Sequence, residues 1–98
     1  MAEISFEWDE KKDASNIKKH GISFGEAQTV FIDESALLIH DPDHSDEEDQ
    51  FLLLGLSSKF KILVVCHCYR KSAEIIRIIS ARKATRHEQK EYWERCSK

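Results

Sequence analysis

The stretch Glu74–Trp93 reads Glu-Ile-Ile-Arg-Ile-Ile-Ser-Ala-Arg-Lys-Ala-Thr-Arg-His-Glu-Gln-Lys-Glu-Tyr-Trp. Its first half is a β-branched apolar run interrupted only by Arg77, and this pattern predicts a strand over 74–81. Thr85 and Glu88 then have the spacing of a capping box, in which the two side chains satisfy free backbone N–H groups at a helix start. We therefore predict that a strand leads directly into a helix over 86–97.

Positive charge is concentrated in this strand–helix segment, which contains Arg77, Arg82, Lys83 and Arg86. Guanidinium groups bind phosphate through paired N–H donors, so the cluster suits a ligand that carries phosphate. Because side chains alternate along a regular strand, Arg77 and Arg82 should point to opposite faces of the sheet. A shared site would require a β-bulge, or the end of the strand, to redirect Arg82.

Two further apolar runs, 51–56 and 62–69, precede this strand, and short turn-forming segments separate the three. Short connections favour antiparallel pairing, so we predict an antiparallel meander. Both faces of these strands carry apolar side chains, and each face therefore needs a cover. We expect two N-terminal helices to cover one face, and the last helix or a partner chain to cover the other.

The N-terminal part begins with a predicted strand and helix. Residues 4–8 alternate apolar and polar side chains, which is the period of a half-buried strand. Residues 10–20 contain neither Gly nor Pro, and Asp9 is placed to cap the start of a helix there. Gly21 is placed to end that helix, because glycine readily adopts the left-handed conformation of a helix C-terminus.

A second capping box, Ser23-x-x-Glu26, starts another predicted helix. Its apolar residues recur at helical spacing and are Phe24, Ala27, Val30 and Phe31. Residues 36–39 then predict a brief strand. The sequence thus predicts one α+β domain over 1–98, with an antiparallel meander of three to four strands, a short N-terminal strand, two N-terminal helices and one C-terminal helix.

The first helix presents a basic face. Lys12, Asn16 and Lys19 lie at i, i+4 and i+7, which places them on one exposed line. Ala14 and Ile17 are its only apolar residues, so its packing stripe is narrow. The ordinary interpretation of such a face is a solvated surface, whereas a second basic element nearby would favour a binding surface.

The formal net charge of −3 conceals an uneven distribution of charge. Six of the 18 acidic residues lie between Asp41 and Gln50, and outside that segment 15 basic residues face 12 acidic ones. Residues 70–98 hold nine basic and four acidic residues. Because the local field matters more than the total charge, a nucleic-acid partner is compatible with this sequence.

The number of cysteines and the lengths of the apolar runs indicate the cellular compartment of the protein. Three cysteines are an odd number, and no apolar signal sequence precedes them, so a secreted disulfide framework is not expected. No apolar run approaches the roughly 20 residues that span a bilayer. We expect a cytoplasmic protein with no membrane segment.

Two stretches contain residue types that bind metals. Asp41, Asp43 and Asp46 provide hard oxygen donors, but the Gly and distal Glu of a calcium loop are missing, and we interpret 41–49 as an acidic hairpin loop. Cys66-His67-Cys68 lacks the spacing of structural zinc sites, and adjacent strand residues point to opposite faces. We predict neither a metal nor another cofactor.

An abundance of cationic side chains without a metal suits one reaction in particular, the cleavage of RNA through its own 2′-hydroxyl. A base removes the hydroxyl proton, cations stabilise the extra negative charge at phosphorus, and an acid protonates the leaving oxygen. His67 and His20 are candidate proton-transfer groups, because histidine changes its charge near neutral pH. A histidine at a helix end also often only caps carbonyl groups, and both interpretations stay open for His20.

Four segments carry a resemblance to a known family, the BrnT-type toxins, which are ribonucleases of bacterial type II toxin–antitoxin pairs with a RelE-like fold. The segments are Phe6-Glu7-Trp8-Asp9, Lys19-His20-Gly21-Ile22-Ser23-Phe24, Asp41-Pro42-Asp43-His44-Ser45 and Arg77-Ile78-Ile79-Ser80-Ala81-Arg82-Lys83-Ala84. The resemblance runs from Phe6 to about Tyr92. Asp49-Gln50-Phe51 departs from the Glu-Arg-Phe that the resemblance leads us to expect.

The resemblance implies a metal-independent ribonuclease of the mRNA-interferase type that inhibits translation and growth. It also implies inhibition by a cognate BrnA-like antitoxin, which itself binds the operator DNA. The candidate catalytic residues are Arg77, Arg82, His67, Lys19 and His20. The candidate RNA-binding residues are Lys12, Arg86, Lys83 and Trp8.

Two functional hypotheses therefore stand at this point. In the first, the chain is an RNA-cleaving toxin. In the second, it is a non-enzymatic binding module whose cations only hold an acidic partner peptide or RNA. A sequence-specific DNA binder is disfavoured, because no pair of helices reads as a helix-turn-helix with base-reading residues.

Overall fold

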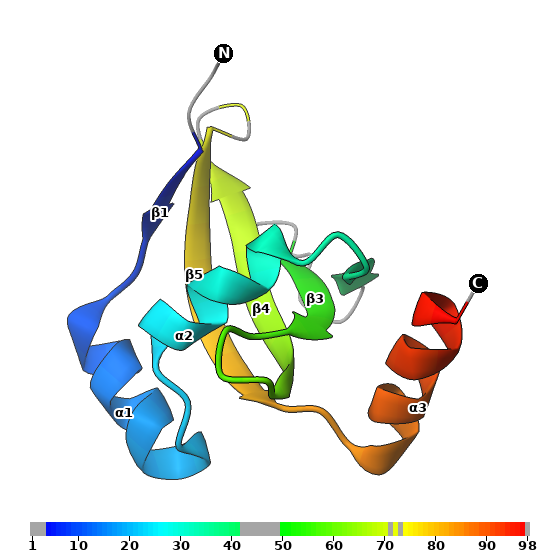
Figure 1. The fold of residues 1–98 in the computed structure, drawn as a ribbon. Coiled ribbons are helices and arrows are strands. Elements are labelled where there is room, and N and C mark those ends of the chain that lie inside the picture. Colours follow the sequence, from blue (N-terminus) through cyan, green and yellow to red (C-terminus); the bar gives the residue numbers. More distant parts are fainter. Residues whose placement is uncertain (1–3, 42–49, 71, 73, 98) are drawn as a thin grey trace.

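The computed structural model describes residues 4–41, 50–70, 72 and 74–97. Within them, a twisted sheet lies behind α2 while α3 stands to one side (Figure 1). The elements are β1 (Ser5–Glu7), α1 (Glu10–His20), α2 (Phe24–Thr29), the 3-10 turn η1 (Val30–Ile32), β2 (Leu37–Asp41), β3 (Gln50–Leu56), β4 (Ile62–Arg70), β5 (Ile75–Lys83) and α3 (Arg86–Cys96). No helix in these ranges has the length and apolar character needed to cross a membrane.

The sheet has the strand order β1-β5-β4-β3-β2. β3, β4 and β5 form the predicted antiparallel meander, and β2 adds to it in antiparallel fashion. β1 pairs in parallel with the first part of β5, with Phe6 opposite Ile76. The α+β fold class is therefore confirmed, and the parallel pair is the feature that the sequence did not predict.

One face of the sheet, which we call the α2 face, packs against α2 and η1. Leu63, Val65 and Ile78 point to this face and are almost completely buried. They contact Phe24 and Ala27 of α2, both with no exposed surface. The helical spacing that began at Ser23 therefore predicted the buried side of α2 correctly, and Ser23 accepts a hydrogen bond from the backbone N–H of Glu26.

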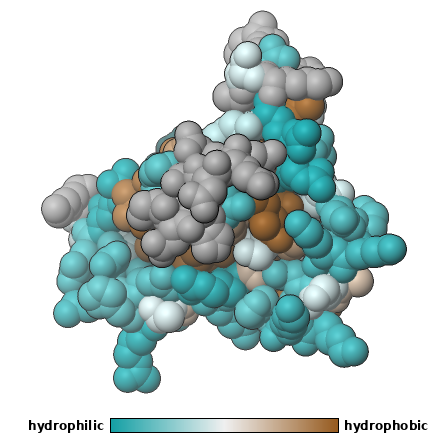
Figure 2. All heavy atoms as spheres, turned by 180° about the vertical axis from the view of Figure 1, so that it is seen from behind, coloured by the Kyte–Doolittle hydropathy of each residue, from teal (hydrophilic) through white to brown (hydrophobic). Residues whose placement is uncertain are grey.

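The opposite face, which we call the α3 face, is covered in part by the C-terminal helix. Tyr92 of α3 packs against Ile62 and Val64 and donates a hydrogen bond of 2.6 Å to Asp33. The last helix thus takes the place that the sequence left open to a helix or a partner. Viewed from behind, the molecule still shows apolar atoms between hydrophilic side chains (Figure 2).

The first helix is anchored by a polar residue rather than by its apolar ones. Asn16 is 6% exposed, whereas Ile17 is 46% exposed. The Asn16 side chain donates to the carbonyl oxygens of Ile22 and Ala81, both at 2.8 Å, and accepts from the backbone N–H of Ala81 at 3.1 Å. The prediction that Asn16 lies on the exposed line of α1 is therefore wrong, because its amide replaces a neighbouring strand at the edge of β5.

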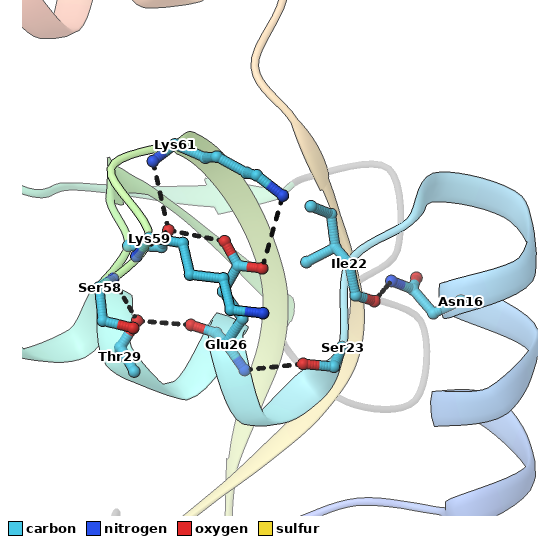
Figure 3. Close-up of polar contacts among 9 residues, drawn as sticks. Asn16, Ile22, Ser23, Glu26, Thr29, Ser58, Lys59 and Lys61 are labelled. Carbon is cyan, nitrogen blue, oxygen red and sulfur yellow. Dashed lines mark hydrogen bonds and ion pairs between the residues drawn. The ribbon is translucent and has the colours of Figure 1, made fainter.

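Polar contacts also join α2 to the turn between β3 and β4 (Figure 3). The buried carboxylate of Glu26 accepts a hydrogen bond of 2.7 Å from the Ser57 hydroxyl and lies 4.0 Å from Lys61 Nζ. The Thr29 hydroxyl accepts from the backbone N–H of Ser58 at 2.9 Å. The contacts from Ser57 and Lys61 satisfy the Glu26 carboxylate, which would otherwise be costly to bury.

The C-terminal helix begins at the predicted capping box. Thr85 accepts from the backbone N–H of Glu88, and Glu88 accepts from that of Thr85. Glu88 also accepts two hydrogen bonds from Arg82, at 2.8 and 3.0 Å. The hydrogen bonds from Arg82, reinforced by that from the Thr85 N–H, lower the pKa of Glu88 from its ordinary value of 4.5 to about 2.

We predict that Asn16→Ala destabilises the protein by about 2–4 kcal/mol, because it leaves two carbonyl groups and one N–H without their partner in a buried setting. Urea unfolding followed by circular dichroism measures the change. Lys18→Ala, a substitution on the exposed side of the same helix, serves as the control and should change stability by less than about 0.5 kcal/mol. Equal stabilities of Asn16→Ala and wild type would contradict this role for the amide.

We predict that Glu88→Gln costs about 1 kcal/mol at pH 7, a value that allows for the solvent exposure of this ion pair. The folded-state pKa of Glu88 is depressed, so its stabilising contribution is complete above pH 4.5 and is lost as the pH falls toward about 2. The difference between wild type and variant in urea unfolding should therefore shrink over that range. A difference that stays constant down to pH 2 would rule out the ion pair as its source.

Candidate active site

A hollow of about 190 Å³ lies between α1 and the outer edge of β5. Its lining comprises Lys12, Ser15, Asn16, Lys19, His20, Ile79 and Ser80. We call this hollow the basic groove, because three of the predicted site residues, Lys12, Lys19 and His20, contribute exposed side chains to it. Among the ion pairs found in the described part of the chain, none involves these three residues.

The basic groove lies where α1 faces a part of the outer edge of β5 that has no strand partner. β1 pairs with β5 only from Ile75 to Arg77, and the Asn16 amide pairs with Ala81. Ile79 and Ser80 lie between these two partners, and their side of β5 faces the groove. The helix periodicity that puts Lys12 and Lys19 on one side of α1 then brings both lysines to that gap.

A β-bulge falls at the same place. Cys66 pairs with Ser80 while His67 pairs with Ile78, so Ile79 is an extra residue on β5. Residues opposite one another in an antiparallel pair point to the same face of the sheet. Because of the extra residue, the side chains of β5 after the bulge point to the face opposite to the one that regular alternation predicts.

The bulge changes the relation between the two arginines. Arg82 pairs with Val64 and Arg77 pairs with Cys68, and these β4 residues are four apart on a regular strand. Both arginines consequently point to the α3 face. The expectation of opposite faces, drawn from a regular strand, is wrong here because the strand contains the bulge that a shared site required.

Each arginine has a carboxylate partner. Arg77 donates to Glu7 at 2.7 Å, and Arg70 lies 3.9 Å from the same carboxylate. The hydrogen bond to Glu7 raises the pKa of Arg77, and that to Glu88 raises the pKa of Arg82. A phosphate bound at either arginine would have to share it with, or displace, the carboxylate.

Sequence reasoning missed Glu7 and Arg70 as neighbours of Arg77. The available signal was the alternation in residues 4–8, which directs Glu7 away from the side of Phe6. It could not identify β5 as the neighbouring strand, because parallel pairing between distant segments leaves no local pattern.

His67 is completely buried, on the α2 face, opposite to the arginines. Its ring lies 4.8 Å from that of Phe31 and 6.1 Å from that of Phe51, and its Nε2 is 3.2 Å from the Tyr69 hydroxyl. Burial lowers the pKa of His67 and so disfavours the charged form of the ring. The structure does not bring His67 to the basic groove, and a role in stabilising the core fits its surroundings.

The remaining predicted residues lie at the margins. Trp8 is half-buried and packs edge-to-face on Phe24, with ring centroids 6.2 Å apart, which is a core contact. Lys83, the last residue of β5, and Arg86, the first residue of α3, are both exposed, and Lys83 points to the α2 face. Gln50 points to the α3 face and accepts a hydrogen bond from Cys66 at 3.4 Å.

The acidic segment considered for metal binding falls largely outside the described residues, as does Asp49. In the ranges that are described, no group of three or more His, Cys, Asp or Glu side chains is arranged to hold a metal ion. The groups gathered around Ile79 and Ser80 are instead two ammonium groups, an imidazole and hydroxyls. Such a set can bind an anion and can exchange a proton with it.

Comparison with known proteins identifies the family. A family model described as the ribonuclease toxin BrnT of type II toxin–antitoxin systems matches residues 8–88, which include α1, the basic groove and β5. The 1.1 Å crystal structure of the Brucella abortus ribonuclease toxin BrnT is similar, with 26% sequence identity over 85% of this chain and 99% of that one, and a TM-score of 0.64. No curated protein sequence matches the chain. This chain belongs to the BrnT family of ribonuclease toxins of type II toxin–antitoxin systems, as the family model over most of its length shows.

Proposed function

We propose that this ribonuclease toxin cleaves messenger RNA at the basic groove without a metal cofactor, and that a cognate BrnA-like antitoxin neutralises it in the cytoplasm. The observation that carries the proposal is the convergence of Lys12, Lys19 and His20 on the bulge of β5. A second basic element beside α1 is the condition under which its cationic face becomes a binding surface. β5 contacts α1 and carries Arg77 and Arg82 on its α3 face, so it is the candidate for that element.

The proposed reaction uses the 2′-hydroxyl of the RNA. A base accepts the hydroxyl proton, the 2′-oxygen forms a bond to phosphorus, and the bond to the 5′-oxygen breaks as that oxygen receives a proton. The products are a 2′,3′-cyclic phosphate and a 5′-hydroxyl end. DNA has no 2′-hydroxyl, so the same site would leave DNA intact.

In this proposal the lysines of the groove hold the scissile phosphate, since two ammonium groups stabilise the charge that develops at phosphorus. His20 is the proton-transfer group, because it is the exposed histidine that lines the groove. Arg77 and Arg82 lie on either side of Ser80 along β5 and contact the flanking phosphates. Operator DNA is bound through the antitoxin rather than by this chain alone.

The alternative is a binding module that uses the same cations without cleaving RNA. Arg77 and Arg82 already donate hydrogen bonds to the carboxylates of Glu7 and Glu88, which shows that both guanidinium groups can bind an acidic partner and supports this alternative. The two functions differ in their products. Total RNA incubated with the purified protein in the presence of a chelator yields new cyclic-phosphate ends only if the chain is an enzyme.

We predict that Lys19→Ala and His20→Ala each lower the rate of RNA cleavage by about 100-fold or more, the usual scale for loss of charge stabilisation or of a proton-transfer group. Lys18→Ala is the matched control, because Lys18 adjoins Lys19 in α1 but does not line the groove. Single-turnover cleavage of a labelled RNA measures the rates. Equal rates for Lys18→Ala and Lys19→Ala would remove the groove from the mechanism.

We predict that Arg77→Ala and Arg82→Ala each weaken RNA binding and relieve the growth arrest caused by the toxin expressed alone. Each substitution removes a phosphate contact, so the salt dependence of RNA affinity should also become less steep. Filter binding at several salt concentrations and plating efficiency are the measurements. Arg95→Ala, an exposed arginine on α3, is the control, and full toxicity of both β5 variants would show that these arginines are dispensable.

A further inference from the structure

The two edges of the sheet differ in the hydrogen-bond partners of their backbone groups. At one edge, β1 and the Asn16 amide provide partners for the backbone of β5. At the other, β2 is the terminal strand, and no described strand pairs with its outer side. Alternate residues of an edge strand direct their N–H and C=O groups away from the sheet, where they can receive a further strand.

β2 also lacks two of the features that usually discourage such pairing, an edge lysine and a proline within the strand. Its first three residues, Leu37, Leu38 and Ile39, are apolar, and the strand contains neither Lys nor Pro. Leu38 is 49% exposed and pairs with Leu53 on the α2 face. Ile39 is 39% exposed and lies on the α3 face. An incoming strand could therefore bury apolar surface on both faces as well as form backbone hydrogen bonds.

The charged residues near β2 indicate which kind of chain could pair with its outer edge. Residues 33–41, which contain β2 and the segment before it, include three acidic residues, Asp33, Glu34 and Asp41, and neither Lys nor Arg. A hollow of about 340 Å³ beside Leu37 is also lined by Glu91, Glu94 and Arg95. A second copy of this chain would bring like charges together, and RNA would be repelled, whereas a basic segment would be attracted.

We propose that β2 is the docking edge for the antitoxin, which adds an extended segment to the sheet as a sixth strand. Its apolar side chains cover Leu38 and Ile39, and its Lys or Arg side chains face the described acidic residues beside β2, which include Glu91 and Glu94. This inference rests on the antitoxin partnership of the proposed function. It assigns the partner to the edge of the sheet that lies farthest from the basic groove.

Hydrogen exchange tests the proposal on the intact toxin, alone and in complex with its co-expressed cognate antitoxin. Backbone amides of β2 should exchange at least about tenfold more slowly in the complex, because the added strand supplies acceptors for them. The double variant Leu38→Lys, Ile39→Lys should weaken antitoxin binding by about tenfold or more, since it places charges on the apolar edge and makes pairing unfavourable. Cells expressing that variant should no longer be rescued by the antitoxin.

Phe60→Ser is the control, because Phe60 is an 85% exposed apolar residue on a different part of the surface, and its loss should leave antitoxin binding unchanged. Unchanged exchange of β2 in a formed complex, or wild-type affinity of a folded double variant, overturns the proposal. So does a dimer of the toxin alone that protects β2. RNA cleavage is a separate assay: its absence would refute the proposed catalysis, while protection of β2 would still support this docking edge.

Discussion

The outer edge of β5 is the constraint on which the site depends, because the backbone groups of that strand need hydrogen-bond partners wherever water is excluded. Two partners of different kinds supply them. β1 serves residues 75–77, and the side chain of Asn16 serves Ala81. Neither reaches Ile79 and Ser80, and the bulge falls at the same point. The basic groove is thus the space that remains where the pairing of β5 changes from a strand to a helix.

The cations around β5 fall into two classes, which differ in their carboxylate partners. Arg77 and Arg82 are each paired with a carboxylate that also belongs to the architecture, Glu7 in β1 and Glu88 in the capping box of α3. Lys12 and Lys19 carry no such pair within the described residues. The lysines can therefore bind an anionic ligand directly, whereas a ligand of the arginines must share them with, or displace, the bonded carboxylate.

The sequence predicted those parts of the fold that are encoded locally. Capping boxes at Ser23 and Thr85, the terminating Gly21 and the apolar runs of the meander each depend on a few neighbouring residues. The role of Asn16, the bulge at Ile79 and the parallel pairing of β1 depend on contacts between segments far apart in the chain, and periodicity contains no signal for them. His67 illustrates the same limit for the site, because only the packing of Phe31 and Phe51 shows that its ring is buried.

Because we propose different edges of the sheet for RNA and for the antitoxin, the two proposals need a physical link through which antitoxin binding inhibits RNA cleavage. Neighbouring strands lie about 4.8 Å apart, so a strand added outside β2 would lie four strand spacings, or about 19 Å, from β5. An extended chain covers about 3.3 Å per residue, and roughly six residues would cover about 20 Å. In the proposed docking, about six residues after the added strand would therefore be enough for the antitoxin to reach Arg77 or Arg82 on the α3 face. Glu7 and Glu88 already show which chemical group binds those arginines, so acidic residues following the basic strand would compete there with RNA phosphate.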